Sequence, residues 1–255
     1  MALNLDRYGS RNNLNLQIFD YVSSTPIMTF DYATTTTNEF TGESVYARGG
    51  DGNPKRIVWS GDKDSTLAVE TQVFTLQHLS MLAGEPIERG AHNIYKSQIV
   101  TVEDDGSGGK QITLTKPPVG EVSIYSYVNG VMVDAQASTA VAGNVVTLDP
   151  TSTVKIGEDV EVYYQWNSPE TAKLSYTTKG FPGYVKIAGD TIYATEKGGG
   201  IQGVQQVFPK AKLQPNFTVT YSPTGDPASL SLTFDLFPVL IDGKEVMKEE
   251  ILYED

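Results

Sequence analysis

Apolar and polar residues alternate in four segments of this chain, at residues 27–35, 66–74, 214–222 and 229–237. Successive side chains of a β-strand point to opposite sides, so a period of two predicts strands with one buried face. Apolar residues such as Leu67, Val69, Leu230 and Leu232 are expected to form that face. The opposite faces carry Thr, Ser, Asn, Gln and at most one carboxylate each.

Three other segments show different patterns. Leu76, Leu79 and Leu82 recur at helical spacing and Gly84 follows them, which predicts one short helix that ends there. Residues 38–56 are rich in glycine and charged residues, so we expect a long loop. The acidic end of the chain, residues 244–255, is expected to be partly loose.

The stretch from residue 97 to 166 has its own series of turn signals. An acidic, glycine-rich turn at residues 103–109 predicts one hairpin. Asn129-Gly130 predicts another, because both residues readily take the positive φ of a tight hairpin turn. We interpret this stretch as a small inserted β module within an all-β chain.

The composition is typical of a folded protein. Hydrophobic residues make up 39% and charged residues 20% of the 255 positions. Cysteine is absent, which excludes disulfides, thiolate zinc sites and cysteine nucleophiles. No basic region followed by an apolar run opens the chain, and no stretch approaches the roughly 18 apolar residues of a membrane helix. We therefore expect synthesis in a cytoplasm and no membrane anchor.

The formal charge of −12 changes how the polar strand faces are interpreted. An acidic chain repels the phosphates of nucleic acid, although solubility alone would also explain the charge. Small polar strand faces could line a channel if copies of the chain close into a ring. Alternatively, they could be subunit contacts joined by Thr and Ser hydrogen bonds. The candidate channel residues are Asp31, Glu70, Gln72, Thr218, Thr220, Ser231, Thr233 and Asp235.

The sequence contains no complete catalytic or metal-binding motif. His78, on the predicted helix, and His92, in a predicted loop, lack metal-binding spacing and are interpreted as surface or capping residues. Residues 106–110 look like a phosphate loop, but Asp104 and Gln111 stand where glycine and Ser or Thr are required. Carboxylate pairs of glycosidases remain open, because their separation in space defines them. We predict no enzyme activity, no cofactor and no metal.

Three segments carry a resemblance to a known family. They are residues 12–31, residues 61–74 with the short helix, and the Phe-Pro-Lys-Ala-Lys-Leu-Gln-Pro-Asn-Phe-Thr run at 208–218 followed by Gly-Asp-Pro at 225–227. Together they resemble the tail tube proteins of long-tailed bacteriophages with contractile tails. The last segment is the most characteristic, whereas residues 97–166 contribute little to the resemblance.

The resemblance implies a fold of two packed antiparallel sheets with one short flanking helix, plus a β-rich insertion. The tube sandwich would then comprise residues 1–96 and 167–255, interrupted by the module at 97–166. It also implies hexameric rings whose inner sheets join into one barrel. The rings stack into a tube within a contractile sheath, and DNA passes through the tube into the host.

The resemblance also implies partners and a location. The protein would be a virion tail component that contacts its own copies and the sheath, baseplate and terminator proteins, while DNA passes without specific binding. By position, residues 38–56 match a loop that reaches the neighbouring ring. Its candidate stacking residues are Arg48, Asp51, Lys55 and Arg56.

Other functions remain open from the sequence. The chain could be a different virion structural protein, such as a head decoration or baseplate subunit. It could also be a secreted carbohydrate-binding or adhesin module, with Trp59, Trp166 and many tyrosines stacking on sugars, although aromatic residues in strands are more often part of a core or interface. A glycan-active enzyme is a further alternative.

Overall fold

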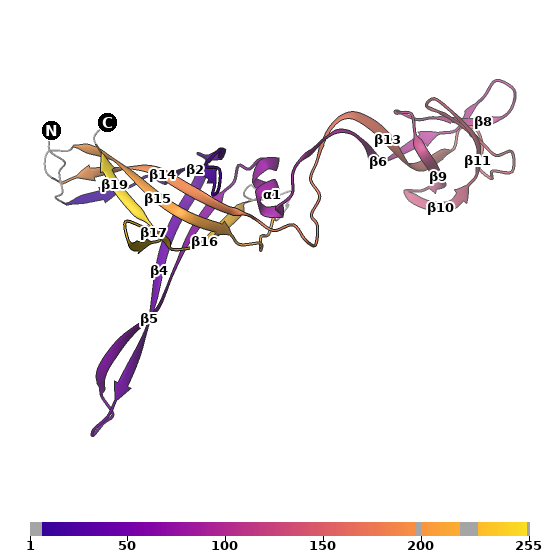
Figure 1. Ribbon diagram of the computed structural model, residues 1–255. Coiled ribbons are helices and arrows are strands. Elements are labelled where there is room, and N and C mark those ends of the chain that lie inside the picture. The colour runs from indigo at the N-terminus through magenta and orange to yellow at the C-terminus, as the bar shows by residue number, and fades with distance from the viewer. Residues whose placement is uncertain (1–6, 197–199, 220–228, 254–255) are drawn as a thin grey trace. The chain divides into compact units, whose positions relative to one another are not determined.

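The computed structural model describes residues 7–196, 200–219 and 229–253. These residues form several antiparallel sheets and one helix, which confirms the predicted all-β class (Figure 1). The chain divides into two compact units. The first unit comprises residues 1–87 and 174–255, and the second comprises residues 88–173.

The first unit is built on a nine-stranded sheet with the main order β3-β2-β14-β15-β16-β5-β4, to which β1 adds beside β14 and β19 beside β15. A small hairpin of β17 and β18 lies outside this sheet. The strands are β1 (Tyr8–Ser10), β2 (Asn15–Asp20), β3 (Pro26–Phe30), β4 (Ala33–Arg48), β5 (Lys55–Thr71), β14 (Tyr184–Thr195), β15 (Ile201–Leu213), β16 (Leu230–Leu236), β17 (Val239–Ile241), β18 (Lys244–Val246) and β19 (Glu249–Tyr253).

One hydrophobic core serves this unit. It gathers alternate side chains from β2, β3, β5, β14, β15 and β16, together with Leu82 of the helix. The predicted apolar faces are confirmed at Leu67, Val69, Leu230 and Leu232, all of which are fully buried. The sequence predicted two packed sheets, but in this unit the strands that form the core belong to one hydrogen-bonded sheet. The helix packs on the same core through Leu82.

The helix α1 (Leu76–Ala83) forms where the leucine spacing predicts it. Thr75 is its N-cap, and the Thr75 Oγ1 accepts a hydrogen bond from the His78 backbone N–H at 3.4 Å. Gly84 ends the helix in the left-handed conformation with φ of 64°. A Cβ at position 84 would clash with the backbone of Phe181, so only glycine fits at this end.

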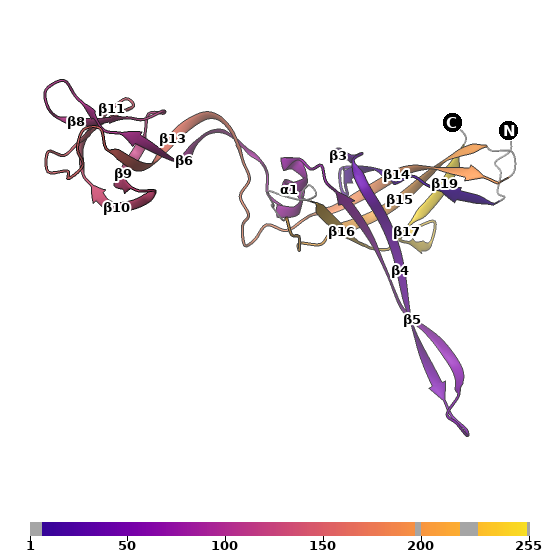
Figure 2. The ribbon, with the colours of Figure 1, turned by 180° about the vertical axis from the view of Figure 1, so that it is seen from behind.

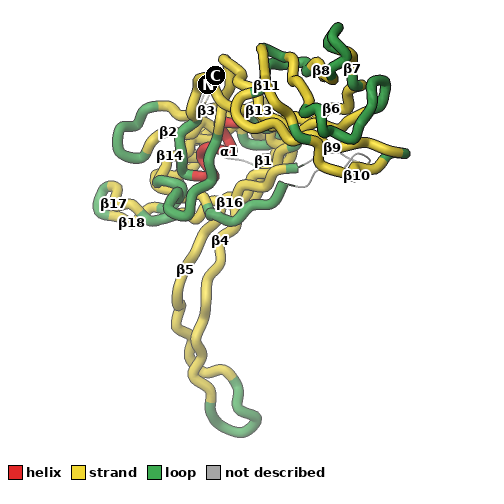
Figure 3. The backbone as a smooth tube through the Cα atoms, turned by 90° about the vertical axis from the view of Figure 1, so that its right-hand side faces the viewer, coloured by secondary structure: helices red, strands yellow, loops and turns green. Residues whose placement is uncertain are grey.

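The second unit is a β-sandwich (Figure 3). Its two four-stranded sheets have the orders β10-β9-β13-β6 and β11-β12-β8-β7, and they share one apolar core. Asn129 and Gly130 take φ of 52° and 84°, which confirms the predicted tight hairpin. The strands are β6 (Glu88–Thr101), β7 (Glu103–Asp104), β8 (Lys110–Thr113), β9 (Val119–Val128), β10 (Val131–Gln136), β11 (Ser138–Ala142), β12 (Val145–Leu148) and β13 (Asp159–Lys173).

The second unit is longer than the module expected at 97–166. Strands β6 and β13 pair from Asp159 with Thr101 to Lys173 with Glu88, so the flanking residues belong to the same ladder. The pairing also shows that the expectation of a loop around His92 is wrong, because His92 lies on β6 opposite Ser168.

The largest difference from the sequence predictions concerns residues 38–56. They form no long loop but most of a hairpin, in which β4 and β5 pair as far as Arg48 with Lys55 around a turn at residues 49–54. Figures 1 and 2 show this hairpin projecting from the rest of its sheet. The apolar alternation that marks a strand is missing there, because neither face packs on the core of this chain.

Three smaller expectations are also wrong. The strand expected at 27–35 is interrupted, because β3 ends at Phe30 and β4 begins at Ala33. The strand expected at 214–222 is absent over residues 214–219, because β15 already ends at Leu213. Pro215 follows and has no N–H to donate to a neighbouring strand. Residues 220–222 lie outside the described residues. The end of the chain is ordered by pairing, since β19 lies beside β15.

Candidate functional site

Strands β5 and β16 bring four of the candidate channel residues onto one polar face. Glu70 lies directly opposite Ser231, and Thr66 lies opposite Asp235, with Thr233 between them on the same side. The other side of both strands is the buried core, because side chains alternate along each strand. Strand β4 continues the polar face with Thr35, Thr37 and Glu39. We call the face formed by these residues of β4, β5 and β16 the polar sheet face.

The polar sheet face is less uniformly acidic than the sequence suggested. Lys212 of β15 lies opposite Asp235, whose Oδ1 accepts a hydrogen bond of 2.8 Å from Gln214 Nε2. The ammonium groups of Lys210 and Lys212 lie 4.4 and 5.3 Å from the centre of the Tyr184 ring. Sequence reasoning missed these lysines because it did not predict β15, although Phe208, Ala211 and Leu213 mark its buried side.

Three of the other candidate channel residues, Asp31, Gln72 and Thr218, lie outside the strands of the polar sheet face. Asp31 sits in the link between β3 and β4, and Gln72 is an exposed residue just beyond the end of β5. Thr218 is exposed in a segment that is not a strand, and Thr220 lies outside the described residues. The four residues are therefore not placed by strand pairing on the polar sheet face, and their position in a channel remains a prediction.

The hairpin of β4 and β5, from Phe40 to Ser65, is called the arm. Beyond the pair formed by Thr66 and Asp235, β16 no longer accompanies β5, so the arm is a two-stranded ribbon. Such a ribbon is at most marginally stable in water by itself. Its large apolar side chains are nevertheless exposed: Phe40 by 45%, Val45 by 61%, Ile57 by 54%, Val58 by 57% and Trp59 by 53%.

These apolar side chains occupy both faces of the arm. Ile57, Val58 and Trp59 are consecutive in β5, so the middle one points to the opposite face from its neighbours. Across the ribbon, Val45 pairs with Trp59 and thus extends the apolar surface onto β4. Exposed apolar surface of this kind marks an interaction site.

Positive charge gathers at the tip of the arm. Arg48, Lys55 and Arg56 flank a turn whose acidic residue is Asp51. Arg56 Nε donates a hydrogen bond of 3.0 Å to the Gly49 carbonyl, and Lys55 Nζ lies 3.7 Å from the centre of the Tyr46 ring. Within the described part of the chain, none of the three cations pairs with a carboxylate.

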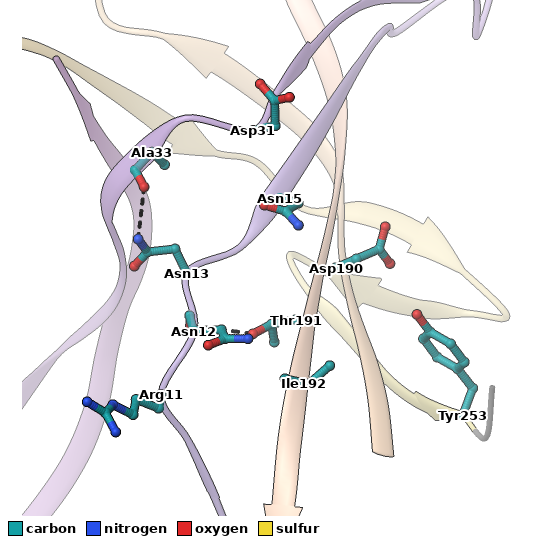
Figure 4. A pocket seen from close by; sticks show the side chains of 10 residues that line it. All are labelled: Arg11, Asn12, Asn13, Asn15, Asp31, Ala33, Asp190, Thr191, Ile192 and Tyr253. Carbon is teal, nitrogen blue, oxygen red and sulfur yellow. Dashed lines mark hydrogen bonds between the residues drawn. The ribbon is translucent and has the colours of Figure 1, made fainter. Parts of the chain in front are cut away.

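A polar hollow of about 410 Å³ opens near the first residues of β4 (Figure 4). Asp190 of β14 receives hydrogen bonds from Gln17 Nε2 at 3.1 Å and from Gln205 Nε2 at 3.0 Å. In Figure 4, Asn15 lies between Asp190 and Asp31. The Asp31 carboxylate accepts no hydrogen bond among the described residues. The hollow is lined by Arg11, Asn12, Asn13, Asn15, Asp31, Ala33, Asp190, Thr191, Ile192 and Tyr253.

The two histidines have structural environments. His78 Nδ1 accepts a hydrogen bond of 2.9 Å from the Thr75 backbone N–H, so His78 completes the cap of α1 as a capping residue. Burial lowers the pKa of His78, and the negative charge of Asp31 opposes this with a smaller effect. The lowered pKa favours the neutral imidazole, which can accept the hydrogen bond. His92 Nδ1 lies 2.6 Å from Thr171 Oγ1 on the adjacent strand.

The phosphate-loop-like segment is a hairpin turn between β7 and β8. The carboxylate of Asp104 accepts hydrogen bonds from the backbone of Gly106 and Gly108, and that of Asp105 accepts from Ser107 and Gly109. The N–H groups that a phosphate would require therefore already bind carboxylates of this chain.

In ranges 7–196, 200–219 and 229–253, no group of three or more His, Asp or Glu side chains is arranged to hold a metal ion. Over the same ranges, no helix is long and apolar enough to cross a membrane.

A family model described as the YomU/Tube protein family covers residues 12–246, which is most of the chain. No curated protein matches the sequence.

Proposed function

We propose, from the premise that this chain belongs to the YomU/Tube protein family, that it is a structural subunit of a phage tail tube. The family supports a phage tube-like protein and favours a structural, non-enzymatic role. The proposal adds three features that come from the resemblance: a contractile tail, closed rings of six copies, and a channel through which DNA is ejected. The absence of catalysis remains a prediction.

The arm is the observation that carries this proposal. A ribbon with Val45, Ile57, Val58 and Trp59 exposed over both faces gains stability only when another surface covers it. Fully burying one such side chain contributes roughly 1.5–3 kcal/mol. Neighbouring subunits of a stacked tube would supply the covering surface. The arm would thus perform the task that the sequence assigned to a loop with Arg48 and Arg56.

The chemistry of the polar sheet face is consistent with the proposal that this face lines the channel. Thr and Ser side chains are short and hydrophilic, so a sheet covered with them leaves room for a wide passenger. Glu39, Glu70 and Asp235 repel phosphates, whereas Lys212 opposite Asp235 offsets part of this repulsion. We propose a mixed wall with a modest excess of negative charge, along which DNA slides without a fixed binding site.

The carbohydrate-binding alternative is weakened by where the two tryptophans lie. Trp59 belongs to the arm of the first unit, and Trp166 packs against the core of the second unit with Lys116 Nζ 5.0 Å from its ring centre. The two rings belong to separate units. A head decoration or baseplate subunit of the same particle and a glycan-active enzyme stay open as alternatives.

Electron microscopy of the purified full-length protein tests the proposal. We expect rings and tubes with a central channel, and their symmetry should be sixfold. Sedimentation of the same sample measures how much protein has assembled. Monomers that never associate, over a range of concentrations and salt, would refute the tube function.

A further inference from the structure

The tip of the arm and the polar hollow are chemically complementary. Among the described residues Arg48 has no hydrogen-bond or ion-pair partner for its side chain, Arg56 donates to the Gly49 carbonyl, and Lys55 lies over the Tyr46 ring. In the hollow, the Asp31 carboxylate accepts no hydrogen bond and forms no ion pair among the described residues, although its charge acts on His78. A guanidinium with free donors and a carboxylate with free lone pairs form a strong charge-assisted pair.

The hollow is built to receive a hydrogen-bonding cation. Asp190 is held in place by Gln17 and Gln205, whose amides orient its carboxylate without neutralising it. Amide side chains of Asn12 and Asn15 line the same space and offer additional acceptors. Arg11 also lines the hollow, so its charged lining residues are two carboxylates, Asp31 and Asp190, and one cation.

The arm tip and the hollow lie at opposite ends of the same strand. Ala33, the first residue of β4, lines the hollow, and Arg48, the last, lies at the tip. Fifteen steps of about 3.3 Å separate the two ends by roughly 50 Å. A tip therefore cannot reach the hollow of its own chain. Contact between the tip of one copy and the hollow of another is heterologous, and such contacts repeat along a stack.

We propose that the cationic tip of each arm docks in the Asp31–Asp190 hollow of the next copy along the tube. Arg48 pairs with Asp31, and the apolar flanks around Trp59 pack on the surface beside the hollow. The occupant is a second copy because both complementary surfaces belong to this chain. This inference rests on the proposed tube function and specifies its contact between rings.

A charge swap tests the pairing. Arg48→Glu and Asp31→Lys should each reduce the sedimented tube fraction by about tenfold or more, because each places like charges in contact. The double variant restores opposite charges at every contact and should recover tubes. Arg89→Glu and Asp134→Lys make the same charge changes on exposed residues of the second unit and should leave assembly unchanged.

A covalent test does not depend on those charges. The chain has no cysteine, so Gly49→Cys at the tip and Asn12→Cys at the hollow introduce the only thiols. Residue 49 has open space around a Cβ. Oxidised tubes of the double variant should give a ladder of linked chains on a denaturing gel, whereas each single variant should not.

The outcomes separate the two proposals. If the wild-type chain never assembles, both the tube function and this contact are wrong. If it forms tubes but the swapped variants behave like their controls and no ladder appears, the tube function stands and this contact is wrong. Circular dichroism of each variant distinguishes lost assembly from lost folding.

Discussion

At the residue scale, His78 shows how a side chain with catalytic potential serves a structural role. Its ring accepts a hydrogen bond from the Thr75 N–H at the start of α1. The same ring lies 4.4 Å, centre to centre, from the Phe30 ring of the core, at an interplanar angle of 49°. The acceptor role requires a neutral imidazole, and burial lowers its pKa accordingly. The helix cap should therefore be sensitive to acid.

The first prediction follows from this pKa. Well above the ordinary pKa of 6.5, His78 is neutral in the folded and the unfolded chain, so its protonation does not affect the free energy of unfolding. As the pH falls below 6.5, the unfolded chain takes up a proton before the folded chain does, so the folded state loses stability. In His78→Gln, which keeps a capping-box residue that does not titrate, this loss should disappear.

Urea unfolding of the unassembled chain between pH 7.5 and 5 measures the effect. His92→Gln is the matched control, because it removes the other histidine, on β6, and leaves the cap of α1 intact. Equal pH dependence in the wild type and His78→Gln would show that His78 does not titrate as inferred.

At the scale of elements, the arm and the central strands follow opposite rules. Strands β5 and β16 bury one face in the core of their own unit, so their side chains alternate cleanly. The arm has no core of its own and exposes apolar residues on both faces. Its composition is therefore explained by surfaces outside this chain.

The second prediction concerns Val45 and Trp59, a cross-strand pair on the arm. Replacing both with serine removes apolar surface that is exposed in the single chain. The free energy of unfolding of the unassembled chain should therefore change by less than about 0.5 kcal/mol. Assembly should fall steeply, because the arm then has less apolar surface to bury against a neighbour. Sedimentation and electron microscopy provide the measurement.

Ile99→Ser is the control for this double variant. Ile99 is also exposed, by 50%, but lies on β6 of the second unit. Its variant should assemble like the wild type. Tubes of normal yield from the Val45→Ser, Trp59→Ser variant would exclude the arm from the subunit contacts.

At the scale of the whole molecule, each of the two units has its own hydrophobic core. Each apolar cluster draws its residues from one unit alone. The second unit leaves and rejoins the first through β6 and β13, whose ends Glu88 and Lys173 are paired partners. The first unit should therefore be able to fold and assemble without the second.

The third prediction is a deletion of residues 88–173. Because Glu88 and Lys173 lie opposite each other, a short glycine linker can join residues 87 and 174 without strain. We expect the shortened chain to remain folded and to form tubes with an unchanged channel. Electron microscopy beside the full-length protein is the measurement. A shortened chain that folds but never assembles would give the second unit a direct role in the ring.

The fourth prediction concerns the channel of the assembled tube. Glu70→Lys with Asp235→Lys replaces two carboxylates of the polar sheet face and leaves Lys212 opposite a second lysine. If this face lines the channel, the variant tubes should bind DNA with an affinity that falls steeply with salt, as phosphate contacts release counterions. A DNA-binding assay over a range of salt concentrations measures this.

The control for the channel variant changes the same number of charges outside the polar sheet face. Glu103→Lys with Asp134→Lys lies on exposed residues of the second unit. Failure of Glu70→Lys with Asp235→Lys to assemble would favour the alternative that the polar sheet face is a subunit contact. Normal assembly without added DNA affinity, equal to the control, would remove the face from the channel wall.

The features that depend on near neighbours in the chain follow directly from the amino-acid sequence. The alternation at Leu230 and Leu232 identified β16, the leucine spacing with Gly84 identified α1, and Asn129-Gly130 identified a hairpin. Each of these follows from local geometry, in which backbone conformation and burial recur with a fixed period. The lack of cysteine and of catalytic motifs was equally visible.

Which distant residues meet is visible in the folded chain and not in the sequence pattern. The tertiary structure set Ser231 beside Glu70 and Lys212 beside Asp235, and it brought Asp190 towards Asp31 at the hollow. It also turned residues 38–56 into an arm, where local pattern fails because neither face is buried in this chain. Pairing between strands that are far apart in sequence depends on backbone hydrogen bonds, which every residue except proline can donate, so sequence periodicity carries little information about it.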